Sequence, residues 1–454
     1  MRAIAPILFV ASAIFAQPPA IRTGAVFNSA SRTPSMLPGG AIARGALFEI
    51  EGVRLGSSAQ TTSVSVAGHS VPLIAVSPRH IQARMTANVP IGEVTLLVSV
   101  DGHLSAPYPL RVVNGNFAFF GRPASAAPGE TITLSGTGLG PSPPEIWLGP
   151  QRAAVVSTHR GAGADPDEIT IRIPAQSPIG CHVPVQARYP GAPAANTVTL
   201  TIGACEPPVV LSGRTAGLLA ITRTVKPPAT VTDDASAAFA LRDAISPNPI
   251  LAVPPPGTCA TYTGAAAAET QPDARPGLDA GRELYIIRDR NQQPITAMPG
   301  APGMYRRTLR GPGFLDPGTL TIGGDGGPDV GPFEIAIPAP VPLVWENRDS
   351  ITSIDGRRGV TLWWRPPAKS KDALVLIGIR AIDTTQTAWA AAYCSASAAS
   401  GTFTIPPEAL ATLPATNASL ALSYVSSAVP VSAKGVDHAI ALSIHIQSIE
   451  LGRP

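Results

Sequence analysis

The chain has 454 residues, enough for three or four domains of ~100–150 residues each. Its 43 Gly and 50 Pro residues recur every few positions and disfavour helices, while the Val, Ile and Thr between them favour strands. The formal charge is only +3, and no basic run is interleaved with aromatic residues, which argues against nucleic-acid binding. The composition therefore predicts an all-β protein.

Residues 1–16 are predicted to be a secretory signal peptide. Arg2 supplies the positive start, a short apolar stretch follows, and Ala16 is the small residue at its end. The stretch is too short to span a bilayer, and no later run is apolar for ~20 residues, so we expect no membrane span. The mature protein is expected to be secreted, in an extracellular or periplasmic location.

Four cysteines fit an oxidising compartment and allow three disulfide pairings. Cys181 begins one predicted strand and Cys205 ends the next, and their midpoint falls inside the turn at residues 191–195, so the two can face each other across a hairpin. Cys259 and Cys394 would then form the second bond. The alternative is four unpaired, buried thiols. A metal site is not indicated, because no two cysteines have close ligand spacing.

The front of the chain contains a duplication. Residues 43–56 return as residues 127–140, with Ala, two Gly and the final Leu-Gly matched. Residues 81–92 return as residues 169–180, and both copies end in Pro-Ile-Gly before a predicted strand. Each unit holds ~85 residues of short strands with regular turns, which suits a seven-strand sandwich. The predicted sandwiches cover residues 24–114 and 115–204.

These blocks resemble IPT/TIG domains, which are immunoglobulin-like modules. Further motifs strengthen a resemblance to secreted bacterial proteins with paired TIG-like modules, over about residues 24–204. The sequence departs from that group at Arg44-Gly45, where Pro-Gly is usual, and at Ile81-Gln82-Ala83, where Gln-Ile-Asn is usual. The resemblance implies tandem immunoglobulin-like β-sandwiches and brings no catalytic residues. The further motifs are Asn28-Ser29-Ala30-Ser31, Leu37-Pro38-Gly39-Gly40, Glu51 to Gly56, and Val76 to Gln82.

The second half is predicted to hold two more β units. Residues 205–340 are expected to form a third β domain with an irregular N-terminal part, and residues 341–454 a fourth domain that is a β-sandwich. The border is placed near Pro338-Ala339-Pro340. The strand predictions rest on alternating apolar residues bounded by Gly or Pro. They include Glu283 to Arg288, Tyr305 to Leu309, Leu320 to Ile322, Phe333 to Ile337, Val360 to Arg365, Ala373 to Ile379, Ser419 to Val425 and His438 to Ile449.

No motif for catalysis or for a cofactor is found. There is no His-Glu-x-x-His, no Gly-x-Ser-x-Gly elbow and no phosphate-cradling loop before a helix, so we expect no metal, no cofactor and no enzyme activity. The glycine loop with Asp325 and Asp329 offers too few oxygens for calcium and is interpreted as a hairpin turn. One alternative stays open, an enzyme whose acid and base carboxylates lie far apart in sequence. Its candidates are Asp233, Asp234, Glu283 and Asp325.

Trp363 and Trp364 are adjacent, so on a strand they point to opposite faces. We assign Leu362 and Trp364 to the core, and Thr361, Trp363 and Arg365 to the other face. An exposed Trp363 beside Arg365 could stack on a sugar or contact a protein, and the alternative is a Trp covered by a neighbouring loop or domain. The leading hypothesis is a secreted, non-catalytic binding or structural protein whose ligand is unknown. The second is a carbohydrate-binding accessory protein of extracellular polymer degradation, so the expected partner is a protein or a polysaccharide at the cell exterior.

Overall fold

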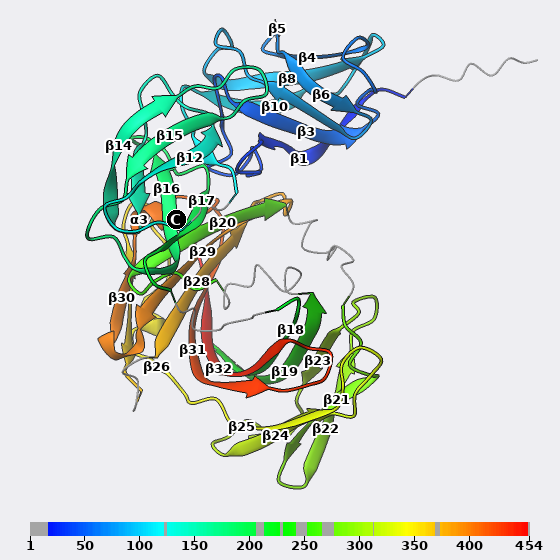
Figure 1. Ribbon diagram of the computed structural model, residues 1–454, viewed down its shortest axis with the longest axis vertical. Helices are drawn as coiled ribbons and strands as arrows, with labels where there is room; N and C mark the ends of the chain where they lie inside the picture. Colours follow the sequence, from blue (N-terminus) through cyan, green and yellow to red (C-terminus); the bar gives the residue numbers. More distant parts are fainter. Residues whose placement is uncertain are drawn as a thin grey trace, which may run out of the picture.

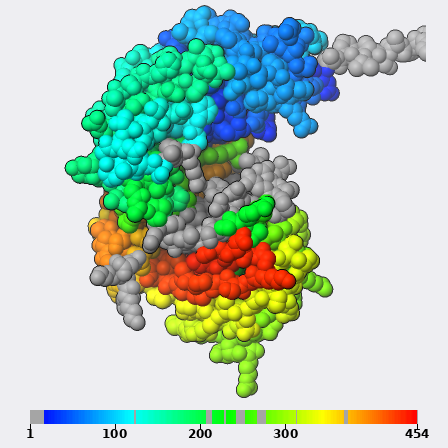
Figure 2. All heavy atoms as spheres, viewed as in Figure 1, coloured from blue at the N-terminus to red at the C-terminus, as the bar shows by residue number. Residues whose placement is uncertain are grey.

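The structure is a computed structural model that describes residues 17–121, 125–205, 213–227, 230–241, 252–265, 277–311, 313–367 and 373–452. The predicted signal peptide lies outside these residues. The regular secondary structure is almost entirely β-strand and forms immunoglobulin-like β-sandwiches in tandem, which confirms the predicted fold class. Within those ranges no helix is long and apolar enough to cross a membrane. Figure 1 shows two sandwiches at the top and a long, curved sheet below them, and Figure 2 shows the front half of the chain, in blue and cyan, above the C-terminal part in yellow to red.

The first sandwich packs a four-stranded sheet, in the order β1-β3-β7-β6, against a six-stranded sheet in which β2-β10-β8-β4-β5 follow one another and β9 joins β8. Phe48 and Ile50 point into the core between the sheets, as their alternation along one strand predicts. The strands are β1 (Ala20–Asn28), β2 (Ile42–Ala43), β3 (Leu47–Val53), β4 (Thr62–Val66), β5 (His69–Ser70), β6 (Leu73–Ser77), β7 (His80–Arg84), β8 (Gly92–Val100), β9 (His103–Leu104) and β10 (Tyr108–Val113).

The second sandwich is one seven-stranded sheet, in the order β11-β12-β15-β14-β13-β16-β17, folded over its own core. The fold occurs at β14, whose first residues pair with β13 and whose remainder pairs with β15, with an irregular register between Val155 and Ser157. The strands are β11 (Ala118–Phe119), β12 (Thr131–Thr137), β13 (Glu145–Leu148), β14 (Gln151–His159), β15 (Asp167–Arg172), β16 (Gly180–Arg188) and β17 (Thr197–Ile202).

The sequence repeat between the sandwiches has a backbone explanation. Gly45 and its counterpart Gly129 both have a positive φ, at 81° and 85°. Arg54 and its counterpart Gly138 share the same property, at 59° and 99°. A Cβ on Gly138 would lie only 2.4 Å from the carbonyl oxygen of Asn116, so a side chain is excluded there by space as well as by conformation. The repeated residues therefore mark turns that both sandwiches need.

One arginine contributes several of the hydrogen bonds between the two sandwiches. Arg84, at the end of β7, donates hydrogen bonds to the carbonyl oxygens of Gly45 in its own sandwich and of Gly161, Gly163 and Asp165 in the next one. Its side chain is largely buried, and this burial lowers the pKa of the guanidinium despite nearby carboxylates. Four carbonyl acceptors compensate for the lost hydration.

The back half of the chain is organised around one twelve-stranded sheet, in the order β20-β29-β28-β31-β32-β18-β19-β23-β22-β21-β24-β25. β18 and β32 are parallel neighbours, and Ala216 pairs with His438. β18 and β19 are regular strands of 12 residues in a stretch that was expected to be irregular. The strands are β18 (Thr215–Lys226), β19 (Thr230–Leu241), β20 (Thr258–Ala265), β21 (Glu283–Arg288), β22 (Asn291–Ala297), β23 (Met304–Thr308), β24 (Thr319–Gly324), β25 (Phe333–Pro338), β28 (Leu374–Ile382), β29 (Ala388–Ser397), β31 (Ala418–Val431) and β32 (His438–Leu451).

One face of β32 contributes side chains to two hydrophobic cores. Ala439 and Ala441 pack into one core, with β18, β19 and β21 to β25. Ile449 and Leu451 pack into the other, with β28, β29, β31 and a small sheet of three strands, β26 (Val344–Trp345), β27 (Val360–Arg365) and β30 (Thr402–Ile405). The predicted domains 205–340 and 341–454 share this sheet, because β18, β19 and β20 precede the border in sequence but pair with strands that follow it.

Between the two cores, the same face of β32 is polar and binds the segment of residues 338–343, which we call the strap. The hydroxyl of Ser443 donates to the carbonyl oxygen of Pro338 at 2.5 Å. The main-chain N–H of Leu343 donates to Nδ1 of His445 at 3.3 Å, and the side chain of Gln447 donates to the carbonyl oxygen of Leu343. The predicted border near Pro340 falls inside this strap.

Threonine hydroxyls connect the front sandwiches to strand β20 of the back half. The hydroxyl of Thr33 donates to the carbonyl oxygen of Ala195 and lies 2.8 Å from the hydroxyl of Thr263. Thr197 and Thr261 form a second pair, 2.6 Å apart. Leu37 of the first sandwich also packs into the core that contains Ile449.

All four cysteines form disulfides. Cys181 at the start of β16 bonds to Cys205, which follows β17, with 5.0 Å between the Cα atoms. Cys259 and Cys394 lie directly opposite each other on β20 and β29 and form the second bond. One bond therefore closes a local hairpin, and the other attaches the edge strand of the large sheet to its neighbour.

Candidate functional site

The candidate site lies on a small sheet of three strands, β26 (Val344–Trp345), β27 (Val360–Arg365) and β30 (Thr402–Ile405), at the outside of the back half (Figure 1). β27 is the middle strand, and its residues alternate strictly between the two faces. The inward set is Val360, Leu362 and Trp364, and the outward set is Thr361, Trp363 and Arg365.

This alternation confirms the predicted assignment of the two faces. Trp364 is only 2% exposed, and its indole N–H donates to the carbonyl oxygen of Ala398 at 2.9 Å. Trp363 is 54% exposed, so the alternative that a loop or domain covers it is wrong. Two adjacent tryptophans therefore have opposite environments, because neighbouring side chains of a strand point to opposite faces.

The backbone beneath Trp363 is held from both sides. On one side, the main-chain N–H of Glu346 donates to the carbonyl oxygen of Trp363 at 2.8 Å. The side-chain oxygen of Asn347 accepts the main-chain N–H of Trp363, also at 2.8 Å. On the other side, Trp363 pairs with Thr402 of β30. The position of the indole thus depends on a strand residue whose main chain is hydrogen-bonded or paired on both sides, rather than on a loop.

Polar side chains surround the exposed indole. A guanidinium nitrogen of Arg365 lies 3.4 Å from a carboxylate oxygen of Glu346. The hydroxyls of Thr361 and Thr404 lie 2.8 Å apart, and the hydroxyl of Thr402 donates to the carbonyl oxygen of Leu362 at 3.1 Å. We call this outward surface the Trp363 face. Its members are Val344, Glu346, Thr361, Trp363, Arg365, Thr402 and Thr404.

The other four of the chain's five tryptophans are covered. Trp345 and Trp364 are core residues. Trp147 carries the guanidinium of Arg188 on its ring, 4.9 Å from the centroid, and Trp389 carries that of Arg380 at 5.3 Å. In the described part of the chain, Trp363 is the tryptophan that is more than one third exposed. This combination of exposure and polar surroundings makes the Trp363 face the candidate site.

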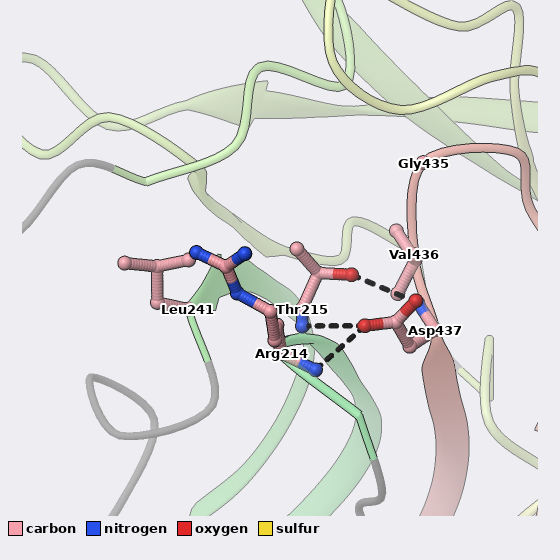
Figure 3. A pocket seen from close by; sticks show the side chains of 6 residues that line it. All are labelled: Arg214, Thr215, Leu241, Gly435, Val436 and Asp437. Carbon is pink, nitrogen blue, oxygen red and sulfur yellow. Dashed lines mark hydrogen bonds between the residues drawn. The ribbon is translucent and has the colours of Figure 1, made fainter.

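Two hollows lie elsewhere and do not contain the predicted site residues. The larger, of about 380 Å³, lies beside the ends of β18 and β32 (Figure 3). Its carboxylate, Asp437, accepts the main-chain N–H groups of Arg214 and Thr215, and these bonds lower the pKa of Asp437. The smaller, of about 140 Å³, lies at the junction of the front sandwiches with β20 and includes Thr197 and Thr261. In the smaller, the hydroxyls of Thr197 and Thr261 lie within hydrogen-bonding distance of each other.

The carboxylates considered for an enzyme are not gathered in either hollow. Asp233 is buried and accepts two hydrogen bonds from the guanidinium of Arg223, which also binds Asp316. The hydrogen bonds to Asp233 raise the pKa of Arg223. Asp234, next in sequence, points to the opposite face and accepts the hydroxyl of Thr308. Glu283 and Asp325 are exposed, on other elements, and no group of three His, Cys, Asp or Glu among the described residues could hold a metal ion.

No protein-family model matches the chain, and no curated protein matches its sequence. Among solved structures, SGBP-B of the Bacteroides ovatus mixed-linkage glucan utilization locus, in complex with a mixed-linkage heptasaccharide, has 12% identity and a TM-score of 0.24, covering 59% of this chain and 67% of that one. The FN1–FN3 domains of chicken CNTN1 have 8% identity and a TM-score of 0.17, covering 96% and 100%.

The ectodomain (Ig1–Ig3) of mouse nectin-like molecule 4 has 15% identity and a TM-score of 0.17, covering 66% of this chain and 95% of that one. The CNTN1 and nectin-like structures each contain three domains in tandem. Because all three TM-scores lie far below 0.5, they carry no argument about what this chain binds.

Proposed function

We propose that the chain is an exported, non-catalytic binding protein that holds a polysaccharide against the Trp363 face. In this proposal the two front sandwiches are TIG-like modules that act as a spacer. The carrying observation is the 54% exposed indole of Trp363 on the middle strand of a three-stranded sheet, with hydroxyl, carboxylate and guanidinium groups on the same face.

Export is supported by two features of the chain. Both disulfides fit an oxidising compartment, where such bonds persist. Residues 1–16 have the charge, length and final small residue of a secretory signal. The IPT/TIG assignment of residues 24–204 rests on the repeated motifs and on the two successive sandwiches over that stretch.

A sugar suits the Trp363 face better than a protein does. A pyranose ring has an apolar face that can cover one indole, and its hydroxyls need hydrogen-bond partners at the rim. The Trp363 face offers one large ring with such partners on both sides. A stable protein interface buries about 800 Å² on each partner around a cluster of apolar anchors. Besides the indole, this face has one exposed large apolar side chain, Val344.

The adjacent tryptophan provides a matched control for the test. Trp363→Ala should abolish retention on immobilised polysaccharides in an array or in affinity electrophoresis. It should change the free energy of unfolding by less than about 0.5 kcal/mol, because the side chain is at the surface. Trp364→Ala should instead destabilise the back half by about 3–5 kcal/mol, because it removes a core indole.

If Trp363→Ala retains full polysaccharide binding, the proposed site is wrong. If the wild-type protein binds no polysaccharide but captures a protein in a Trp363-dependent way, the surface is right and the ligand class is wrong.

A further inference from the structure

We propose that the Trp363 face selects uncharged polysaccharides over acidic ones, with Glu346 as the residue that decides. This inference rests on the proposed function and names its ligand class. Of the seven residues of the face, Glu346 is the one acid and Arg365 the one base, and the two are paired at 3.4 Å. The face therefore has no net charge with which to attract a polyanion.

Glu346 is the charged residue directly beside Trp363. Trp345 pairs with Trp364, and both point inward. Glu346 follows Trp345 and Trp363 precedes Trp364 in this antiparallel pair, so both point outward at the same level. Their backbones are joined by the hydrogen bond from the Glu346 N–H to the Trp363 carbonyl oxygen. Side chains opposite each other in an antiparallel pair have Cβ atoms about 4.5–5.5 Å apart. A sugar stacked on the indole would therefore place its substituents next to this carboxylate.

The two classes of sugar meet different electrostatics there. A uronic acid or a sulfated sugar would bring a second negative charge up to the Glu346 carboxylate, which is repelled. The hydroxyl of an uncharged sugar can donate to that carboxylate, which is a strong acceptor. Arg365 offers N–H donors to sugar oxygens, and Thr402 uses its proton on Leu362, which leaves its oxygen as an acceptor.

Two of the three arginines in the segment between β26 and β27, Arg348 and Arg358, are paired with acids, and the third, Arg357, is exposed. Arg348 lies 2.8 Å from Asp349, and Arg358 lies 3.9 Å from Asp355. These pairs lie before β27 in the sequence, between β26 and β27. Acidic polysaccharides are held by clusters of basic residues without acidic partners, and each of these two arginines has one.

The test uses the whole protein and two soluble polymers, hydroxyethyl cellulose as the uncharged probe and polygalacturonate as the carboxylated one. Affinities are measured by affinity electrophoresis at low and at high NaCl. The wild-type protein should bind the uncharged polymer at least about tenfold more tightly, with little dependence on salt. Glu346→Gln should weaken that binding several-fold and bring the two affinities closer together. Glu145→Gln, which removes the carboxylate of a comparable surface ion pair with Arg152, should leave both affinities unchanged.

The outcomes separate this inference from the proposed function. Tighter binding of polygalacturonate, lost at high salt and dependent on Trp363, would overturn the selectivity and leave the site standing. An unchanged preference in Glu346→Gln would also overturn it, because another group would then decide. Absence of binding to both polymers and to the wider polysaccharide array would overturn the proposed function itself.

Discussion

The front and back halves of this chain build their cores in different ways. In the front half, the named strands of each sandwich pair within that sandwich, and each core is formed by one continuous stretch of sequence. In the back half, Ala216 near the start of β18 pairs with His438 of β32, so the first and the last strands lie side by side. The front half can form its units one after another, whereas the back half needs its last strand before either of its cores is complete.

The difference decides which interactions carry the most stability. A unit that is closed locally has little chain entropy left for a crosslink to remove. A sheet that joins distant segments leaves more chain entropy for a crosslink to remove. The back half also has polar contacts between its two cores, where the strap binds β32. Four predictions test this contrast.

The two disulfides should differ in how much each contributes to the free energy of unfolding. Removing Cys259–Cys394, with Ala at both positions, should cost about 5 kcal/mol, because the bond closes a long loop with a separation of 135 residues. Removing Cys181–Cys205 should cost about 3.5 kcal/mol, since its separation is 24 residues. Hydrogen exchange read separately for each half measures both losses. A larger loss from the front bond would contradict the contrast.

The buried ion pair of the back half should contribute more to the free energy of unfolding than an exposed ion pair of the front half. Arg223→Ala leaves Asp233 buried without its guanidinium partner and should cost about 4 kcal/mol. The control is Arg22→Ala, which removes an exposed partner of Glu51 and should cost less than about 1 kcal/mol. Urea unfolding curves provide the comparison, and equal losses would mean that burial does not govern these pairs.

The strap should make the back half sensitive to acid. Burial, with a smaller contribution from the charge on Arg223, lowers the pKa of His445 to about 4 from an ordinary value of 6.5. As the pH falls, the unfolded chain therefore binds this proton first. The contribution of His445 to stability should be complete above pH 6.5, decrease as the pH falls to about 4, and change no further below it. The total is about 3 kcal/mol.

Unfolding at a series of pH values measures this loss. His445→Gln, which keeps an acceptor near the Leu343 N–H but has no titratable ring, should remove most of the dependence on pH. A variant with the same pH profile as the wild type would assign the effect to another group.

The smallest expected effect is at the junction of the front sandwiches. Arg84→Ala removes the hydrogen bonds to Gly161, Gly163 and Asp165 but touches neither core, so it should cost about 2 kcal/mol at most. The readout is small-angle scattering, which should show a wider range of angles between the sandwiches. Unfolding of either sandwich core in this variant would contradict the view that each closes locally.

Much of this architecture can be predicted from local patterns. The strands expected at Glu283–Arg288 and Val360–Arg365 have those bounds in the structure, because each is a short apolar alternation between turn residues. The partnership of β18 with β32 could not be predicted, because nothing in either segment specifies a partner so distant. Four of the 12 residues of β19 are alanine, which is depleted in strands and gives a weak strand signal.

The candidate site, too, could be predicted from the sequence only in part. The alternation of β27 was enough to place Trp363 and Trp364 on opposite faces. Whether Trp363 would be covered depended on what packs outside the sheet. Glu346 and Thr402 were missed as members of the site, because they reach Trp363 only through strand pairing. The one sequence signal for Glu346 was its place directly after Trp345. Trp345 is a core residue, and neighbouring residues of a strand point to opposite faces.

The amino-acid sequence alone determined the β class, the tandem repeat, the faces of individual strands and a pairing for the four cysteines, since these follow from side-chain spacing and turn chemistry along a short stretch. Only the tertiary structure decided that the last strand joins two cores, that the strap binds across it, and that Trp363 stays exposed. Those features depend on contacts between segments far apart in the chain, whose choice is set by the burial of whole faces rather than by any local pattern.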